Sequence, residues 1–275
     1  MKWIYDIPTW ELGFLIVGPT LLVSSLVLIL RRNWIYRHFR LANDTNDGIN
    51  GFFSAMGMLY GILLGLVAIS AWENMGYVET ISSKEATSII QLYRSVSTLD
   101  EPMKSQLHHD LEDYLKYVIY VAWPAHKLGE VPEGGSIILT QFLARLSTYH
   151  TRNVEQQIFL AEVISSYKSL IEDRRVRMHY VLDSGIGSII WVVILVGGVL
   201  TLSCSFLIHL PTLGGHLFVN SLFSLLLSLM IFLIAAIDQP FRGELGVTPH
   251  AYSSTLSVLH ILANTNTNTN TITPS

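Results

Sequence analysis

Four long stretches of this sequence lack aspartate, glutamate, lysine and arginine altogether. They cover residues 12–30, 51–72, 185–210 and 217–237, and each is long enough, at about 19 residues or more, to cross a hydrocarbon core about 30 Å thick as a helix. In lipid a backbone must satisfy its own hydrogen bonds, and a single helix does so without a partner. The sequence therefore predicts an integral, multi-pass membrane protein surrounded by the lipid bilayer.

Charge and cysteine are scarce in the chain as a whole. Charged residues make up only 14% of it, against about 25% in an average soluble protein, and the mean hydropathy is +0.43. The formal net charge of −4 comes without a basic face, which argues against binding to nucleic acid. Cys204 is the single cysteine, so an intrachain disulfide and a metal site built from thiolates are both excluded.

Strand signals are also missing, because no Asn-Gly or Asp-Gly turn lies between alternating apolar and polar runs. We expect an all-α fold in which residues 1–72 and 185–237 form two transmembrane hairpins. A helical water-side domain at residues 73–184 lies between them in the sequence. Residues 238–263 form a C-terminal segment beside the membrane, and the alternating Asn and Thr of residues 264–275 predict a disordered tail.

Proline, glycine and capping residues divide the water-side domain into helices. The apolar pattern after the second span continues to about Leu99, so that span is expected to extend as a long helix into water. Asp100 supplies a capping oxygen in front of Pro102, and an amphipathic helix should run from there to a stop at Pro124. Residues 124–135 are typical of a loop, and residues 137–182 fit one long helix or two joined near residues 150–153.

The basic residues do not decide the orientation in the membrane. Those between the first two spans place this short loop in the cytoplasm by the positive-inside rule, which would put the large domain outside. Those that border the large domain favour the opposite orientation, and the rule discounts loops of more than about 60 residues. The first group is Arg31, Arg32, Arg37 and Arg40, and the second is Lys84, Lys168, Arg174, Arg175, Arg177 and Arg242.

The second span has two distinct faces. Glycines four residues apart form a small-residue stripe that favours close helix packing, and they are Gly57, Gly61 and Gly65. The opposite face is apolar and holds Phe52, Met56, Leu59 and Leu63. This face could line an apolar constriction that gates an ion path by dewetting. Lipid contact or core packing explains it equally well.

Small and polar residues in the last two spans indicate packing between helices. In the fourth span, the polar side chains at spacings of three and four favour hydrogen bonds to a neighbouring helix or to their own backbone, although a wet pathway is an alternative. These side chains are Asn220, Ser221, Ser224 and Ser228. In the third span, Gly197 and Gly198 indicate close packing or a bend.

Catalytic and metal-binding patterns are not found. The sequence has no nucleophile elbow, no glycine-rich phosphate loop and no intramembrane pair of ionisable residues, so we expect no enzyme and no cofactor. His108 and Glu112 share a helical face, but two ligands fall far short of a metal motif.

The most specific stretch follows the fourth span. An acid, Asp238, ends the helix there, followed by Pro240, Phe241, Arg242 and Gly243. Together with several upstream segments, this stretch resembles the bestrophin-like family of four-span membrane proteins, over nearly the whole chain from residue 51 to residue 251. The upstream segments are residues 59–65, 84–86, 92–94, 123–124 and 174–177.

The resemblance implies a fold and a function. The bestrophins are anion channels built as rings of five four-span subunits, so it implies a homo-oligomer, a path for small anions, and a neck lined by Phe52, Met56, Leu59 and Leu63. It also implies that the large domain and both termini are cytoplasmic and that the membrane is the plasma membrane. The calcium-binding acidic run of the bestrophins does not carry over, because Arg242 interrupts the Pro-Phe-Gly segment and only Glu244 follows.

Two functions from different classes therefore stay open. The first is an oligomeric chloride-type channel in which Arg174, Arg175 and Arg177 attract anions to the mouth. The second is a non-conducting membrane scaffold or sensor whose helical domain binds a partner. In that case the same arginines pair with Asp238, Glu172 or lipid headgroups.

Overall fold

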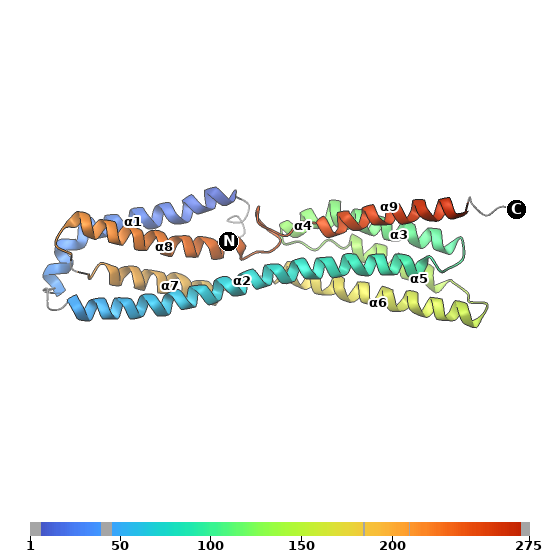
Figure 1. Cartoon of the computed structure of the whole chain (residues 1–275), viewed down its shortest axis with the longest axis horizontal. Coiled ribbons are helices and arrows are strands. Elements are labelled where there is room, and N and C mark those ends of the chain that lie inside the picture. Colours follow the sequence, from blue (N-terminus) through green and yellow to red (C-terminus); the bar gives the residue numbers. More distant parts are fainter. Residues whose placement is uncertain (1–6, 40–45, 184, 209, 271–275) are drawn as a thin grey trace. The chain divides into compact units, whose positions relative to one another are not determined.

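The computed structural model describes residues 7–39, 46–183, 185–208 and 210–270, and this part of the chain is helical and contains no strand. The all-α expectation is confirmed. In chain order the helices are α1 (Thr9–Phe39), α2 (Asn46–Val96), α3 (Met103–Tyr117), a π-helical turn (Val118–Ala122), α4 (Trp123–Lys127), α5 (Gly134–Ser147), α6 (Val154–Leu182), α7 (Ser188–Ser205), α8 (Leu213–Ile237) and α9 (His250–Asn270) (Figure 1).

Four of these helices are long and apolar enough to cross a membrane. They are α1, α2, α7 and α8. Helices α1, α2 and α8 contain the first, second and fourth charge-free stretches, and α7 covers residues 188–205 of the third. The chain divides into two compact units, each built from two separate parts of the sequence. The first, here called the membrane unit, is Met1–Met75 with Gly185–Gly246, and the second, the extramembrane unit, is Gly76–Ser184 with Val247–Ser275.

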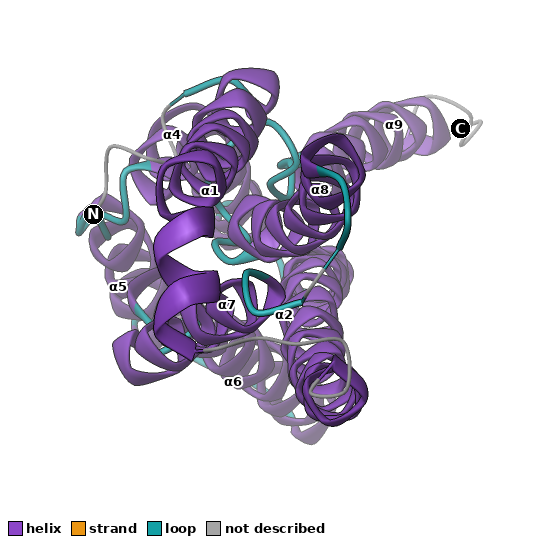
Figure 2. Cartoon of the chain, turned by 90° about the vertical axis from the view of Figure 1, so that its left-hand side faces the viewer, coloured by secondary structure: helices purple, strands orange, loops and turns teal. Residues whose placement is uncertain are grey.

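In the membrane unit, helices α1, α2 and α7 all pack against α8. Helix α1 lies along α8, as Figures 1 and 2 both show. The first half of α2 packs on α7 and α8 through a small core of Leu64, Ile194 and Ile234. Tyr60 of α2 donates a hydrogen bond to the Ile194 carbonyl, and a Cβ at Gly197 would collide with the Tyr60 ring. The expectation of close packing at this glycine is confirmed.

A buried polar network joins three helices of the membrane unit. Ser24 of α1 lies 2.7 Å from Ser224 of α8 and accepts a hydrogen bond of 2.6 Å from the Asn220 amide. Ser205 of α7 donates to the Asn220 carbonyl oxygen at 2.9 Å, while Ser228 bonds its own backbone at Leu225. Polar side chains in lipid that are satisfied by neighbouring helices hold those helices in register. The prediction of helix-to-helix bonding is thus confirmed for Asn220 and Ser224.

The extramembrane unit begins with the second half of α2, which ends at Val96, close to the predicted end near Leu99. Helix α3 begins at Met103, but Asp100 does not cap it. Its carboxylate instead accepts a hydrogen bond from Gln156, and Glu101 accepts from the Ser105 backbone. The choice between one long helix and two is settled for two, because Asn153 caps α6 by accepting from the Gln156 backbone.

The predicted stop at Pro124 is wrong. The chain passes through a π-helical turn at Val118–Ala122 and continues as α4 to Lys127. A proline lacks a backbone N–H, and it is tolerated in the first turn of a helix, where that donor has no partner. The π turn breaks the regular bonding pattern and makes Pro124 a first-turn residue.

Two further boundaries differ from expectation. Helix α9 runs to Asn270, whereas the sequence indicated a disordered tail from residue 264, and residues 271–275 lie outside the described part. Tyr252 and Leu259 are buried in the unit and hold the first part of α9, and extending a formed helix is far easier than starting one. Helix α1 likewise continues to Phe39 into the expected loop, while Arg40 lies outside the described residues.

Candidate functional site

The membrane part of α2 leaves an apolar face uncovered by the rest of the described chain. Of the predicted neck residues, Phe52 and Leu59 are 60% and 68% exposed, whereas Met56 and Leu63 are half-buried at the edge of this face. The exposed surface continues along the helix and contains no charge through the span. Its other members are Met58, Ile62, Leu66 and Ile69.

The glycine stripe of α2 also meets no other described part of the chain. A Cβ added at Gly57, Gly61 or Gly65 would find nothing within 4 Å. No other helix of the described chain therefore makes the close approach inferred from their spacing. Within the span, the contacts of α2 with α7 and α8 come from the face between the glycine stripe and the exposed apolar face. This face carries Tyr60 and Leu64.

A fully buried ion pair lies at the centre of the extramembrane unit. Glu85 of α2 and Arg177 of α6 are 0% and 1% exposed, and their side chains form two hydrogen bonds of 2.5 and 2.9 Å. Tyr114 of α3 donates to Glu85 at 2.6 Å and Tyr252 of α9 at 3.0 Å. A carboxylate that accepts four hydrogen bonds, two of them from a guanidinium, has its buried charge compensated.

Aromatic and imidazole side chains complete this cluster. The Arg177 guanidinium lies over the rings of Trp123 and Tyr252, at 6.0 and 5.5 Å from their centroids. It also donates to Nδ1 of His126 at 3.2 Å, since an arginine has no acceptor. Burial, with a smaller contribution from Arg177 and Arg174, lowers the pKa of His126 to about 3. Burial likewise raises the pKa of Tyr252 well above its usual value, so its hydroxyl stays a donor.

The three arginines predicted as anion-attracting or ion-pairing have different surroundings. Arg177 forms the buried pair just described, and Arg174 donates to the Ser136 hydroxyl at 3.0 Å. Arg175 alone is exposed. The partner of Arg177 is Glu85, which was not singled out as a site residue in the sequence. The sequence feature that could have identified Glu85 is its position as a lone acid on an apolar helical face, between Ile81 and Ile89, which are both buried.

The segment after α8 is a compact turn that ties α8 to α7. Asp238, at the end of α8, is buried, and its carboxylate accepts hydrogen bonds from the Ile186 backbone at 2.5 Å and from the Trp191 indole at 3.4 Å. Gly243 adopts a φ of 72°, which a side chain disfavours. Pro240, Phe241 and Arg242 are buried in the same turn. This geometry favours a structural lock at the end of α8.

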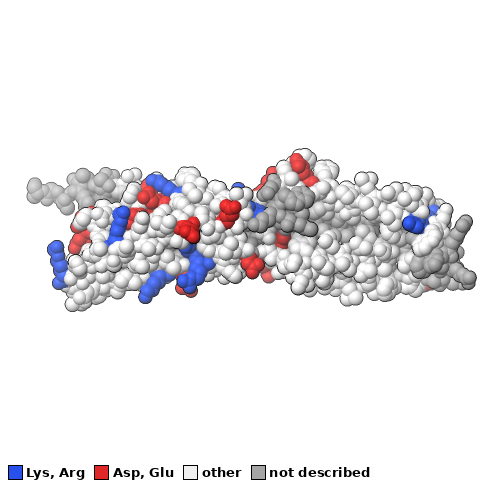
Figure 3. Space-filling view, turned by 180° about the vertical axis from the view of Figure 1, so that it is seen from behind, with Lys and Arg blue, Asp and Glu red and all other residues white. Residues whose placement is uncertain are grey.

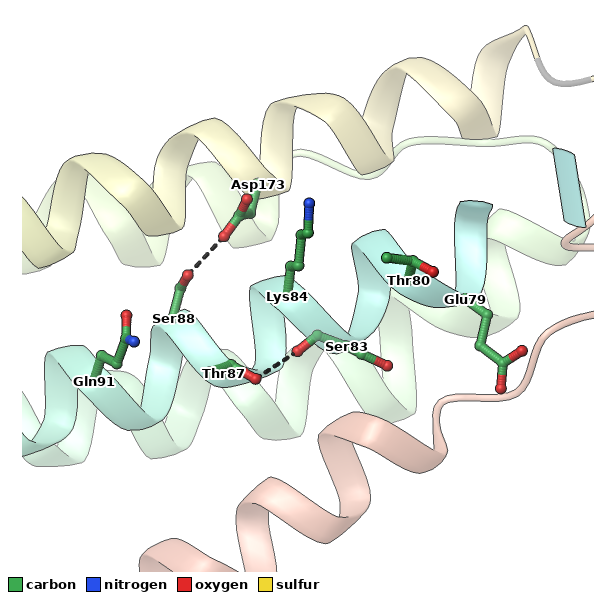
Figure 4. A pocket seen from close by; sticks show the side chains of 8 residues that line it. All are labelled: Glu79, Thr80, Ser83, Lys84, Thr87, Ser88, Gln91 and Asp173. Atoms are coloured by element: carbon green, nitrogen blue, oxygen red, sulfur yellow. Dashed lines mark hydrogen bonds between the residues drawn. The ribbon is translucent and has the colours of Figure 1, made fainter. Parts of the chain in front are cut away.

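A polar groove of about 580 Å³ opens on the extramembrane unit between α2 and α6 (Figure 4). Asp173 of α6 forms one wall and accepts a 2.6 Å hydrogen bond from Ser88. Lys84 extends from α2 toward the same side, beside Asp173. No sequence pattern had indicated this groove. Its remaining lining residues are Glu79, Thr80, Ser83, Thr87 and Gln91.

Metal-binding geometry is not found in the part of the chain that the structure describes, where no group of three His, Cys, Asp or Glu side chains comes together. His108 instead contacts the Tyr93 carbonyl, while Glu112 pairs with Lys116 at 2.7 Å. Charged side chains gather over the extramembrane unit, whereas the surface over the spans is almost free of them (Figure 3).

Together these features define a multi-pass helical membrane protein whose extramembrane helical domain is inserted between its second and third spans. A family model, the Bestrophin-like domain, matches residues 18–252. The chain belongs to the bestrophin-like family.

Solved structures with the same fold include bacterial bestrophins. A crystal structure of a bestrophin homologue from Klebsiella pneumoniae, carrying a point mutation, is 12% identical, with a TM-score of 0.64. A second structure of the Klebsiella homologue is also 12% identical, with a TM-score of 0.65. A structure of a protein described as a membrane protein is 11% identical, with a TM-score of 0.66. Each alignment covers 90% of this chain and 96% of the other. No curated protein matches the chain.

Proposed function

We propose that this protein is an oligomeric channel for small anions such as chloride, with a narrow apolar neck lined by α2. The observation that carries the proposal is the charge-free face of α2, which extends from Phe52 past Leu59 and is covered by no other described part of the chain. An apolar constriction gates an ion path by wetting and dewetting. Family membership and the bestrophin fold support the same function.

A ring of subunits follows from the same face. One helix from one chain cannot enclose a path, whereas repeated copies around an axis can. We assign Phe52, Leu59 and the neighbouring Ile62 to the neck, with Met56 and Leu63 at its edge. The glycine stripe, Gly57 to Gly65, then lies where the next subunit approaches, because small residues allow close contact between helices in lipid.

The neck is tested by making it polar. Chloride flux is measured into liposomes that hold the purified protein, comparing wild type with Leu59→Gln. We expect Leu59→Gln to increase flux, about tenfold if it removes a barrier of about 1.4 kcal/mol. The matched control is Leu226→Gln on α8, because Leu226 is 62% exposed and as apolar. It should leave flux unchanged.

Two results would contradict the proposal. A wild-type protein that gives no flux above empty liposomes, across pH and calcium concentrations, favours the non-conducting scaffold whose helical domain binds a partner. A protein that is strictly monomeric or dimeric in detergent has no ring and therefore no central path.

This proposal places the protein in the plasma membrane, with the large domain and both termini in the cytoplasm. Cys204 is the single cysteine, so a Cys204→Ser background makes single-cysteine labelling straightforward. Ser165→Cys on the exposed surface of α6 should resist a membrane-impermeant maleimide in intact cells and react after lysis. Labelling in intact cells would reverse the orientation.

A further inference from the structure

The groove between α2 and α6 contains one cation and several acceptors. Its charged lining residues are Lys84, Glu79 and Asp173. No carboxylate of the described residues forms an ion pair with Lys84, and its side chain is exposed. Figure 4 shows Lys84 beside Asp173, while Glu79 points away from both. The ammonium is therefore a positive charge at the groove that no carboxylate of the described residues neutralises.

Most hydroxyl groups that line the groove already donate their proton within the chain, so only their lone pairs face the groove. Thr80 donates its proton to the Gly76 carbonyl and Thr87 to the Ser83 carbonyl, both at 2.9 Å. Ser88 donates to Asp173 at 2.6 Å. A hydroxyl has one donor, so these oxygens can offer only lone pairs to an ion. Together with the two carboxylates they would favour a cation if Lys84 were absent.

The groove also follows the face of α2 that the proposed neck uses. Thr80 and Thr87 follow Ile62 and Ile69 along α2 at a spacing of about five helical turns, which returns side chains to the same face of a helix. Along α2 itself, the apolar residues of the span are therefore followed on one helical face by polar side chains.

We propose that Lys84 determines the charge selectivity of the path, with the groove around it forming a polar wall that small anions pass. This inference rests on the proposed channel function. One ammonium per subunit, repeated around a ring, attracts anions and repels cations, as charged rings do in selective pores. Without it, carboxylates and hydroxyl acceptors dominate the wall and the preference reverses.

The test is the reversal potential of the reconstituted protein under a potassium chloride gradient. Wild type and Lys84→Arg should reverse toward the chloride potential. Lys84→Gln should lower the chloride-to-potassium permeability ratio by at least about fivefold, the factor for a unit charge about 4 Å from an ion in water. The control Lys168→Gln removes an exposed lysine of α6 outside the groove and should keep the wild-type ratio.

A second arm changes the charge after folding. Lys84→Cys in the Cys204→Ser background is measured before and after reaction with a methanethiosulfonate reagent that carries a trimethylammonium group. The reaction should return the reversal potential toward chloride, while a neutral reagent should not.

The outcomes separate the two proposals. If wild type conducts anions and both Lys84→Gln and the reagents leave the permeability ratio unchanged, the role of Lys84 is refuted and the channel stands. If wild type conducts but prefers potassium, anion selectivity and the role of Lys84 both fall. If wild type carries neither ion, the channel itself is refuted, and the role of Lys84 with it.

Discussion

Replacing Glu85 with alanine should destabilise the extramembrane unit more than any surface change. The substitution leaves the Arg177 guanidinium buried without its counter-charge and removes the acceptor for Tyr114 and Tyr252. Breaking a buried ion pair by removing one partner costs about 3–5 kcal/mol. With two tyrosine hydroxyls also unsatisfied, we expect the upper part of that range.

Thermal unfolding in detergent measures this loss. Trp123 is buried over Arg177, so its share of the intrinsic fluorescence of the six tryptophans reports on the cluster. For a domain of this size, about 3–5 kcal/mol corresponds to a fall in Tm of about 6–20 °C. Glu162→Ala on the exposed surface of α6 is the matched control, and it should change stability by less than about 0.5 kcal/mol.

A double variant separates charge from packing. Glu85→Met with Arg177→Met removes both charges and replaces them with apolar side chains, a change that is often neutral or stabilising for buried pairs. The reasoning is refuted if Glu85→Ala melts within about 1 °C of wild type. It is equally refuted if the double variant is less stable than Glu85→Ala, because the unpaired charge would then not be the cause.

Two further predictions concern pH and helix packing. The pKa of His126, about 3 when folded, lies below its value of 6.5 in the unfolded chain. The contribution of the neutral His126 imidazole to the free energy of unfolding should therefore be fully present above pH 6.5. It should be lost at about 1.4 kcal/mol per pH unit as the pH falls toward 3. His126→Gln should remove this dependence in chemical denaturation from pH 7 to pH 5, and curves parallel to wild type would exclude the buried neutral imidazole. Gly197→Val should displace the Tyr60 ring and cost about 1–3 kcal/mol by overpacking, lowering the Tm, while Gly214→Val, where a Cβ meets nothing, should not.

The membrane spans could be predicted from the sequence because their signal is local. A charge-free run of sufficient length forms a spanning helix whatever lies elsewhere in the chain. The polar face of α8 was similarly readable, since Asn220 and Ser224 had to find partners in lipid. Their partner Ser24 could not be named, because it lies in α1, far away in the sequence.

The centre of the extramembrane unit was hidden for the same reason. Glu85, Tyr114, Arg177 and Tyr252 come from four helices, and only packing brings them together. Arg177 was therefore grouped by sequence with Arg174 and Arg175 as part of a basic run. Pro124 misled the helix prediction because the π turn before it is a feature of backbone geometry without a residue pattern of its own.

The participation of Tyr252 in the ion-pair cluster sets an order for biosynthesis. A chain is made from its N-terminus, and residues 188–237, which form the last two spans, are translated after Arg177 and before Tyr252. The ribosome must therefore deliver both of these spans before α9 can supply its hydroxyl to Glu85. The extramembrane unit can complete its core only after the membrane segments have been synthesised. A completed core therefore indicates that the second hairpin has already been made.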